Sequence, residues 1–224
     1  MFFDDKTKAF TLIELLIVVA IIGILAAIAV PNFLNAQSRA KIARSYADIK
    51  SITTSLESFR IDKNVLMVDF WDDDTDIGQA RMKDIFNGIG GMHNDRGGTT
   101  GVLAPLTSPV AYMSSVPLDP FAVTGRSGDS TTGLIAADQL APITYLYMDE
   151  EAQIPGRDHS TVLALGNPLY PSTRPLKNGD YVLIAYGPDG RRNSPPGYGL
   201  PYAGTNGILS MGDIWMRSGG GMNE

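Results

Sequence analysis

The apolar residues of the chain are concentrated in one N-terminal run. Between residues 10 and 34, 20 of 25 side chains are hydrophobic, and no charged residue occurs from 15 to 38. About 20 predominantly apolar residues suffice for a helix to cross a bilayer, so the run predicts a transmembrane helix. A cleaved signal peptide is the alternative, but its apolar region usually has only about 7 to 15 residues. No A-x-A cleavage site ends the run here.

A second pattern continues the helix through residues 35–64, which we call the stem. Its large apolar residues recur at spacings of three and four, on one face of a 3.6-residue period. A helix from residue 10 to about residue 62 would be roughly 80 Å long, far more than one membrane crossing needs. We therefore expect this face to pack on the rest of the chain. Its members are Ile42, Tyr46, Ile49, Ile52, Leu56 and Phe59.

Residues 65–224, which we call the head, have a different pattern. Most of the 24 glycines and 14 prolines lie here and separate short apolar runs, as in antiparallel strands. The sequence therefore predicts an α+β fold, with a long N-terminal helix packed against a small antiparallel sheet. The predicted strands are residues 143–148, 162–165, 181–186 and 208–210, and weaker helix or loop candidates are 78–87 and 103–113.

Composition and charge narrow the range of functions. The 18 basic and 24 acidic residues give a net charge of -6, and the head alone carries ten basic and eighteen acidic side chains. This acidic balance argues against nucleic acid as a partner. The absence of cysteine excludes disulfides, thiolate metal sites and a cysteine nucleophile. With two histidines and no phosphate-binding loop or H-E-x-x-H motif, we expect no enzyme.

The start of the chain combines a short polar leader, Phe10, a carboxylate at Glu14 and a long apolar helix. This arrangement closely resembles the N-terminal signature of the type IV filament superfamily, which comprises type IV pilins and the pseudopilins of type II secretion. The resemblance implies that a prepilin peptidase cuts between Ala9 and Phe10 and that Phe10 is then N-methylated. At the position of Ala9 the family usually has glycine, and its leader is usually more basic.

The resemblance also implies an organisation and a location. Residues 1–9 would be the leader and 10–34 the transmembrane and filament-core helix, followed by the stem (35–64) and the head (65–224). The precursor would cross the cytoplasmic membrane once, with its head outside. A membrane assembly platform would build many copies into a helical filament in the periplasm or on the cell surface.

Four residues of the apolar run have expected roles in assembly. A carboxylate among apolar side chains is costly unless it is paired, and the family's partner for Glu14 is the new amine of Phe10 in a neighbouring subunit. Gly23 and Pro31 bracket a stretch in which the helix is weakened. Members of the family loosen between these positions in the filament; the alternative is a plain proline kink.

Two questions stay open at the level of sequence. The filament is either a surface pilus, favoured by the large head, or a secretion pseudopilus, favoured by a motif near the C-terminus. The alternative from another class is a membrane-tethered extracytoplasmic binding module that does not polymerise.

The C-terminal motif suggests one calcium ion. Residues 185–190 and 211–215 resemble the end of major pseudopilins, where a glycine-rich turn and a later aspartate hold calcium. The resemblance assigns side-chain oxygens to Asp189 and Asp213 and a backbone carbonyl to Tyr186. Twenty-three residues separate the two aspartates, more than is usual in pseudopilins. Two surface turn aspartates without an ion are the alternative.

A second group of aspartates lies in residues 69–76. It does not match an EF-hand, because the sixth position is Ile77 and the twelfth is Lys83 rather than glycine and glutamate. We therefore expect a solvated loop. The group consists of Asp69, Asp72, Asp73, Asp74 and Asp76.

Overall fold

The structure is a computed structural model. The chain forms two compact units, Met1–Arg39 and Ala40–Glu224. It describes residues 10–69, 72, 75–89, 99–121, 144–151, 176–188, 202–204 and 214–220.

The predicted long helix is confirmed as α1, Leu12–Lys63, which continues through Pro31 without interruption. Asn64 ends it in the left-handed region, with φ of 55°, and donates its N–H to the carbonyl of Arg60 at 2.8 Å. This arrangement satisfies one of the carbonyls that a helix leaves open at its C-terminus. By length and composition alone, α1 is also the one helix among the described residues that could cross a membrane.

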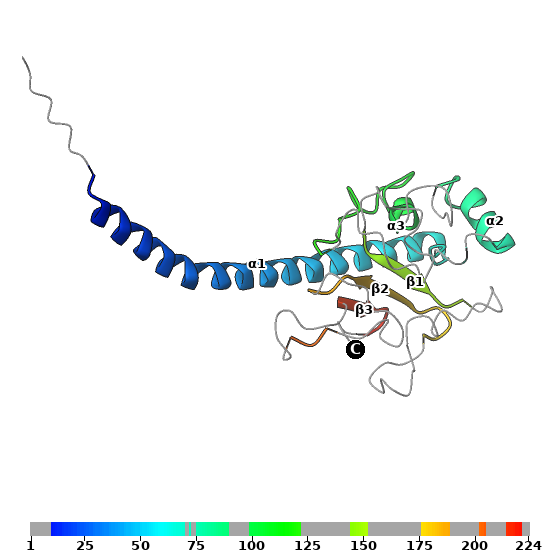
Figure 1. Cartoon of the computed structure of the whole chain (residues 1–224). Helices are drawn as coiled ribbons and strands as arrows, with labels where there is room; N and C mark the ends of the chain where they lie inside the picture. Colours follow the sequence, from blue (N-terminus) through cyan, green and yellow to red (C-terminus); the bar gives the residue numbers. More distant parts are fainter. Residues whose placement is uncertain are drawn as a thin grey trace, which may run out of the picture. The chain divides into compact units, whose positions relative to one another are not determined.

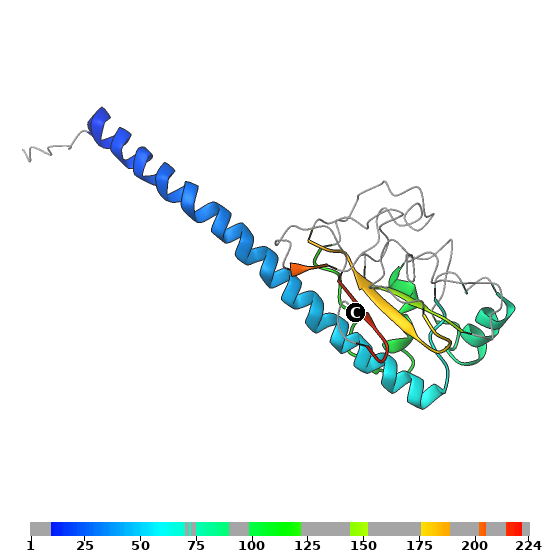
Figure 2. The same ribbon diagram turned by 90° about the horizontal axis from the view of Figure 1, so that it is seen from below.

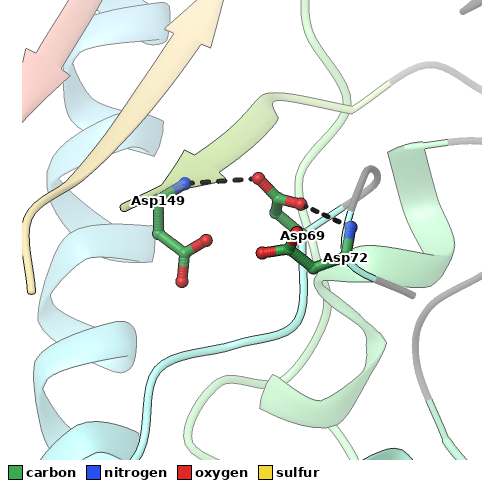
Figure 3. Close-up of side chains that lie close together, drawn as sticks. All are labelled: Asp69, Asp72 and Asp149. Carbon is green, nitrogen blue, oxygen red and sulfur yellow. Dashed lines mark hydrogen bonds between the residues drawn. The ribbon is translucent and has the colours of Figure 1, made fainter. Parts of the chain in front are cut away.

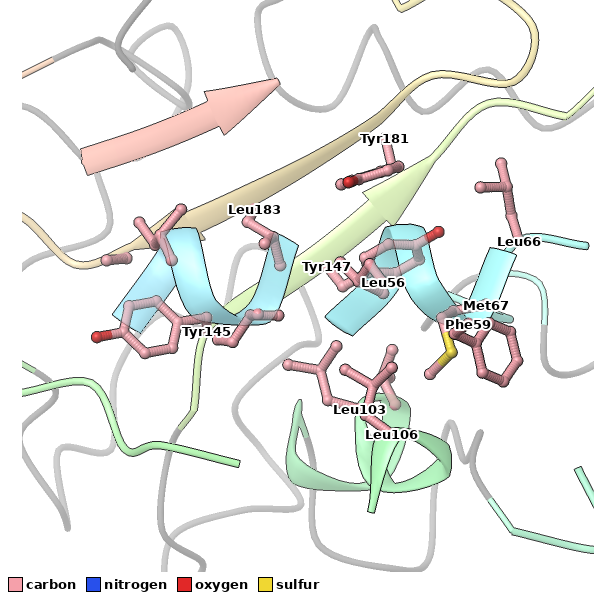
Figure 4. Close-up of a cluster of buried hydrophobic side chains, with 14 of the residues drawn as sticks. Leu56, Phe59, Leu66, Met67, Leu103, Leu106, Tyr145, Tyr147, Tyr181 and Leu183 are labelled. Carbon is pink, nitrogen blue, oxygen red and sulfur yellow. The ribbon is translucent and has the colours of Figure 1, made fainter. Parts of the chain in front are cut away.

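In the second unit, the stem face of α1 is buried as its periodicity predicts. Ile49, Ile52, Leu56 and Phe59 are at most 3% exposed. Figure 4 shows this part of α1 between strands on one side and the segment bearing Leu103 and Leu106 on the other. Most of the stabilisation of a helix in a folded protein comes from such packing of its apolar face.

The sheet is three-stranded and antiparallel, in the order β1-β2-β3. Its strands are Leu146–Asp149 (β1), Tyr181–Ala185 (β2) and Ile214–Arg217 (β3). Figures 1 and 2 show it beside the C-terminal half of α1, so the predicted α+β fold is confirmed. Alternate residues enter two separate apolar clusters, one with Tyr147 and Leu183 and one with Val182 and Trp215. Because β2 is buried at every position, it reads as a continuous apolar run.

Short helices complete the described part of the second unit. These are α2 (Asp76–Asp84), α3 (Thr99–Val102) and the 3-10 helix η1 (Ala104–Leu106). The strands expected at 143–148 and 181–186 correspond to β1 and β2, and the helix candidate at 78–87 corresponds to α2. β3 was not predicted as a strand. The expected strands at 162–165 and 208–210 lie outside the described residues.

Three tyrosine hydroxyls join α1 to other elements of the second unit. Tyr145 donates to Asp48 at 2.9 Å, Tyr181 donates to Glu57 at 2.7 Å, and Tyr112 donates to Asp62. Burial and the neighbouring carboxylate raise the pKa of all three tyrosines, that of Tyr112 to about 12. The phenols therefore remain neutral donors at physiological pH.

Candidate functional site

The N-terminus of α1 is closed by a reciprocal pair of hydrogen bonds. The hydroxyl of Thr11 accepts the N–H of Glu14 at 3.3 Å, and Oε2 of Glu14 accepts the N–H of Thr11 at 2.9 Å. The Thr11 hydroxyl also donates to Oε2 at 2.8 Å. This is a capping box, in which two open backbone donors are satisfied at once. The sequence interpretation missed Thr11, although its T-x-x-E spacing was a sufficient signal.

The rest of the apolar run is exposed in the single chain. Phe10 is 71% exposed, and the large apolar side chains from Leu12 to Leu34 are also exposed to solvent. Apart from the adjoining residues and the nearby backbone of α1 itself, no atom of the described residues lies within 4 Å of the position that a Cβ would occupy at Gly23. Packing within one chain therefore gives no reason for the glycine. An apolar surface of this extent requires either lipid or other protein to cover it.

The predicted calcium ligands are only partly described. Tyr186 is buried, and its N–H donates to Oδ2 of Asp119 at 2.6 Å, while Oδ1 of Asp119 accepts the N–H of Phe121 at 2.9 Å. Asp189 and Asp213 lie outside the described residues. In the β2–β3 ladder, Ala185, which precedes Tyr186, pairs with Ile214, which follows Asp213 in the sequence.

Three aspartates from two segments of the head form a buried acidic cluster, which we define as Asp69, Asp72 and Asp149 (Figure 3). Each is at most 2% exposed, and one carboxylate oxygen from each lies within 4.8 Å of the others. The carboxylate of Asp69 accepts the N–H of Asp72 at 3.0 Å and that of Asp149 at 3.5 Å. The expectation of a solvated loop is therefore wrong for Asp69 and Asp72, because Asp69 bridges this loop to the end of β1.

Burial and neighbouring negative charges disfavour the ionised form of Asp149 in the acidic cluster. Burial raises the pKa of Asp149 well above 3.8, and the charges of Asp69, Glu151 and Asp72 raise it further. Oxygen ligands of this kind suit calcium or magnesium, so these three side chains could hold a divalent cation. No local sequence pattern indicates Asp149, which joins the cluster only when the chain folds.

A buried ion pair lies close to the same strand. The guanidinium of Arg81 forms two hydrogen bonds of 2.7 Å with the carboxylate of Glu151 and contacts the carbonyl of Leu66 at 3.3 Å. Burial lowers the pKa of Arg81, but the bonds to Glu151 and the nearby carboxylates outweigh it, so the pKa is raised. Arg81 therefore stays charged and joins α2 to the segment after β1.

Comparison with known sequences shows similarity in the N-terminal segment of the chain. The family model described as "Prokaryotic N-terminal methylation motif" matches residues 4–30. The N-terminal segment is similar to that of the type IV filament superfamily. The match includes Ala9, Phe10, Glu14 and Gly23, the positions whose roles the resemblance implies.

Individual relatives of this superfamily are similar to the chain over short segments. The type IV major pilin protein PilA of Myxococcus xanthus is 50% identical over 62 residues, 28% of each chain. A fimbrial protein of Pseudomonas aeruginosa is 51% identical over 51 residues, 23% of this chain and 33% of its own length. The type II secretion system core protein G of Escherichia coli is 33% identical over 60 residues, 27% of this chain and 41% of its own.

The similarity thus spans less than half the length of each of these relatives. No solved structure matches the chain. The comparisons therefore support a type IV filament subunit in general. Because the relatives include both pilins and a type II secretion protein, they do not decide between a surface pilus and a secretion pseudopilus.

Proposed function

We propose that this chain is a structural subunit that polymerises into a type IV-like helical filament. The observation that carries the proposal is the exposed apolar half of α1, which coincides with the methylation motif. In the membrane, lipid would cover this surface; in the filament, the same helices of other copies would cover it. The function is then assembly rather than catalysis.

The mechanism we propose begins with processing. A prepilin peptidase would cut between Ala9 and Phe10, and N-methylation would leave a positive amine on Phe10. Glu14 of a neighbouring subunit would pair with this amine. A buried charge pair of this kind can fix the register between neighbours, because a shifted pairing leaves both charges without a partner.

Two variants of one acidic side chain test the pairing. Glu14→Ala and Glu14→Gln are expected to reduce filaments sheared from cells severely while subunit remains in the membrane fraction. Asp84→Ala, an exposed acid in α2, is the matched control and should assemble normally. Unchanged filament yield in both Glu14 variants would instead favour a membrane-tethered binding module that does not polymerise.

Mass spectrometry of the mature N-terminus tests the processing step separately. We expect N-methylated Phe10 in assembled filaments. An intact Met1 in those filaments would refute the amine at Phe10 and with it the register mechanism.

The location of the filament would distinguish a surface pilus from a secretion pseudopilus. Secretion pseudopili would remain in the periplasm, whereas surface pili would be labelled by antibody against the head on intact cells. We place the head outside the cytoplasmic membrane in both cases, with a membrane assembly platform as partner.

We also propose that one calcium ion is held by side-chain oxygens of Asp189 and Asp213 and the carbonyl of Tyr186. Two contacts support this proposal because they hold Tyr186 and the start of β3 in place. Asp119 accepts the N–H of Tyr186, and Ala185 pairs with Ile214. An ion that binds only the folded state stabilises it, by about 2.7 kcal/mol at 100 times its Kd. A chelator should therefore lower the melting temperature, and Asp189→Asn should remove the effect. A melting temperature that the chelator leaves unchanged would contradict this proposal.

A further inference from the structure

A small polar cavity opens at the C-terminal end of α1, within the second unit. Its volume is about 210 Å³. This is below the roughly 300 to 1,000 Å³ typical of sites for drug-sized ligands, so it suits a single small group. Its lining includes Arg60, Asn64, Arg81, Glu151, Asn178 and Gly179.

The charges in this cavity do not cancel. Arg81 and Glu151 neutralise each other through their two 2.7 Å bonds. Arg60 is half-buried, and Glu57, three residues before it on α1, is not part of the cavity lining and accepts the hydroxyl of Tyr181. Within the described ranges, the guanidinium of Arg60 forms no ion pair. Among the charged residues that line the cavity, one positive charge is therefore left over.

The end of α1 does not supply the missing negative charge. The open carbonyls of a helix C-terminus act as about half a negative charge at most. One of them, that of Arg60, is already bonded to the N–H of Asn64. The full charge of the guanidinium exceeds this contribution, so the cavity remains attractive to an anion.

A turn that contains Gly179 lies beside Arg60 in the cavity wall. Gly179 has a φ of 85°, which side-chain-bearing residues rarely adopt, and a Cβ at this position would lie 3.4 Å from Nη2 of Arg60. The φ of this turn therefore favours glycine, and the turn lies in van der Waals range of the guanidinium. A planar guanidinium binds a carboxylate through two parallel hydrogen bonds.

We propose that this cavity binds a carboxylate group through Arg60, and that the carboxylate is an acidic side chain of another copy of the chain. Charge complementarity carries the choice of partner, because the head has eighteen acidic against ten basic residues. The assignment to another copy rests on the proposed function in a filament. The binding of a carboxylate in the cavity does not depend on that proposed function.

The first experiment isolates the cavity. The full chain in detergent micelles is titrated with sodium acetate at pH 7, with sodium chloride holding ionic strength constant, and its melting temperature is followed. We expect a saturable rise in the wild type and in Lys50→Gln, an exposed cation elsewhere on α1. Arg60→Gln should lose the rise, and Arg60→Lys, which keeps the charge without the planar fork, should show a smaller one. An absent rise in the wild type, or an equal rise in Arg60→Gln, overturns the proposal.

The second experiment tests the source of the carboxylate. Filaments of Arg60→Gln and Lys50→Gln are washed with increasing sodium chloride, and released subunit is measured. We expect Arg60→Gln filaments to release subunit at lower salt. Equal release from both variants overturns the assignment to another copy. If the wild type forms no filaments, the proposed function fails while the acetate titration still decides the cavity.

Discussion

At the residue scale, Thr11 and Glu14 have a local role that precedes any role in assembly. Their reciprocal bonds close the first turn of α1 in the single chain. A carboxylate at this position is also favoured by the positive end of the helix dipole. Pairing of Glu14 with a neighbouring amine would therefore replace existing bonds rather than satisfy an isolated charge.

The first residue-scale prediction concerns Thr11. Replacing an N-cap threonine by alanine costs about 0.5 to 2 kcal/mol of local helix stability. We expect Thr11→Ala to accelerate amide hydrogen exchange at Glu14 and Leu15 in micelles, and Thr11→Ser to leave it nearly unchanged. Equal exchange in the two variants would show that the capping box does not hold this turn.

The second residue-scale prediction concerns pH and the acidic cluster. Asp149 has a raised pKa in the folded state, so above its ordinary value of 3.8 the folded chain holds a proton that the unfolded chain has lost. Its contribution to stability therefore falls as pH rises through the raised pKa. Asp149→Asn, which carries no charge at any pH, should melt at a higher temperature than the wild type at pH 8.

The difference between Asp149→Asn and the wild type should shrink as the pH approaches 4. Melting temperatures in chelator-containing buffers from pH 4 to pH 8 measure it, with Asp84→Asn as an exposed control in α2. A difference that stays constant across this range would mean that Asp149 does not titrate as its burial requires.

The residues that sequence could and could not identify differ in the range of their contacts. Thr11 and Glu14 interact three positions apart, so a local motif suffices. Asp69 and Asp149 lie in distant segments, and nothing near either residue indicates the other. The burial of Asp69 was therefore mispredicted, because an aspartate in a polar segment is usually solvated.

At the element scale, periodicity predicts α1 well and the sheet less well. The stem face repeats over six apolar residues, and a long repeat defines both the helix and its buried side. β3 has only four residues, and its sequence also belongs to a motif with another interpretation. β1 is equally short, but it lies in the longer, mostly apolar run 143–148, whereas β3 has no such run around it.

The element-scale prediction concerns the attachment of α1 to β2. Tyr181 is 1% exposed, and its hydroxyl bonds to Glu57 at 2.7 Å. Hydrogen bonds to charged groups contribute about 1.5 to 3 kcal/mol, and Tyr181→Phe removes this one while keeping the ring. We expect a loss of that size in the free energy of urea-induced unfolding.

Tyr112→Phe is the matched comparison, because its bond to Asp62 lies in an exposed position. It should cost less than Tyr181→Phe, since water can replace the lost partner there. An equal loss in both variants would show that burial does not govern the strength of these tyrosine bonds.

At the scale of the whole molecule, the two units have opposite surface properties. The described helix residues before Arg39 are almost wholly exposed despite their apolar composition, whereas the packed core consists of residues from Ile42 onward. The apolar run predicts this contrast. The detailed arrangement of the core depends on contacts between distant segments, which the sequence pattern does not specify.

This contrast leads to a prediction for a shortened chain of residues 40–224. Because the two described apolar clusters contain no residue before Ile42, the shortened chain should fold without detergent. We expect cooperative thermal unfolding by circular dichroism, with a midpoint close to that of the full chain in micelles. It should stay monomeric in solution, since it lacks Phe10, Glu14 and the apolar run. A non-cooperative transition would mean that the first 39 residues contribute to the stability of the head, and stable filaments of the shortened chain would contradict assembly through α1.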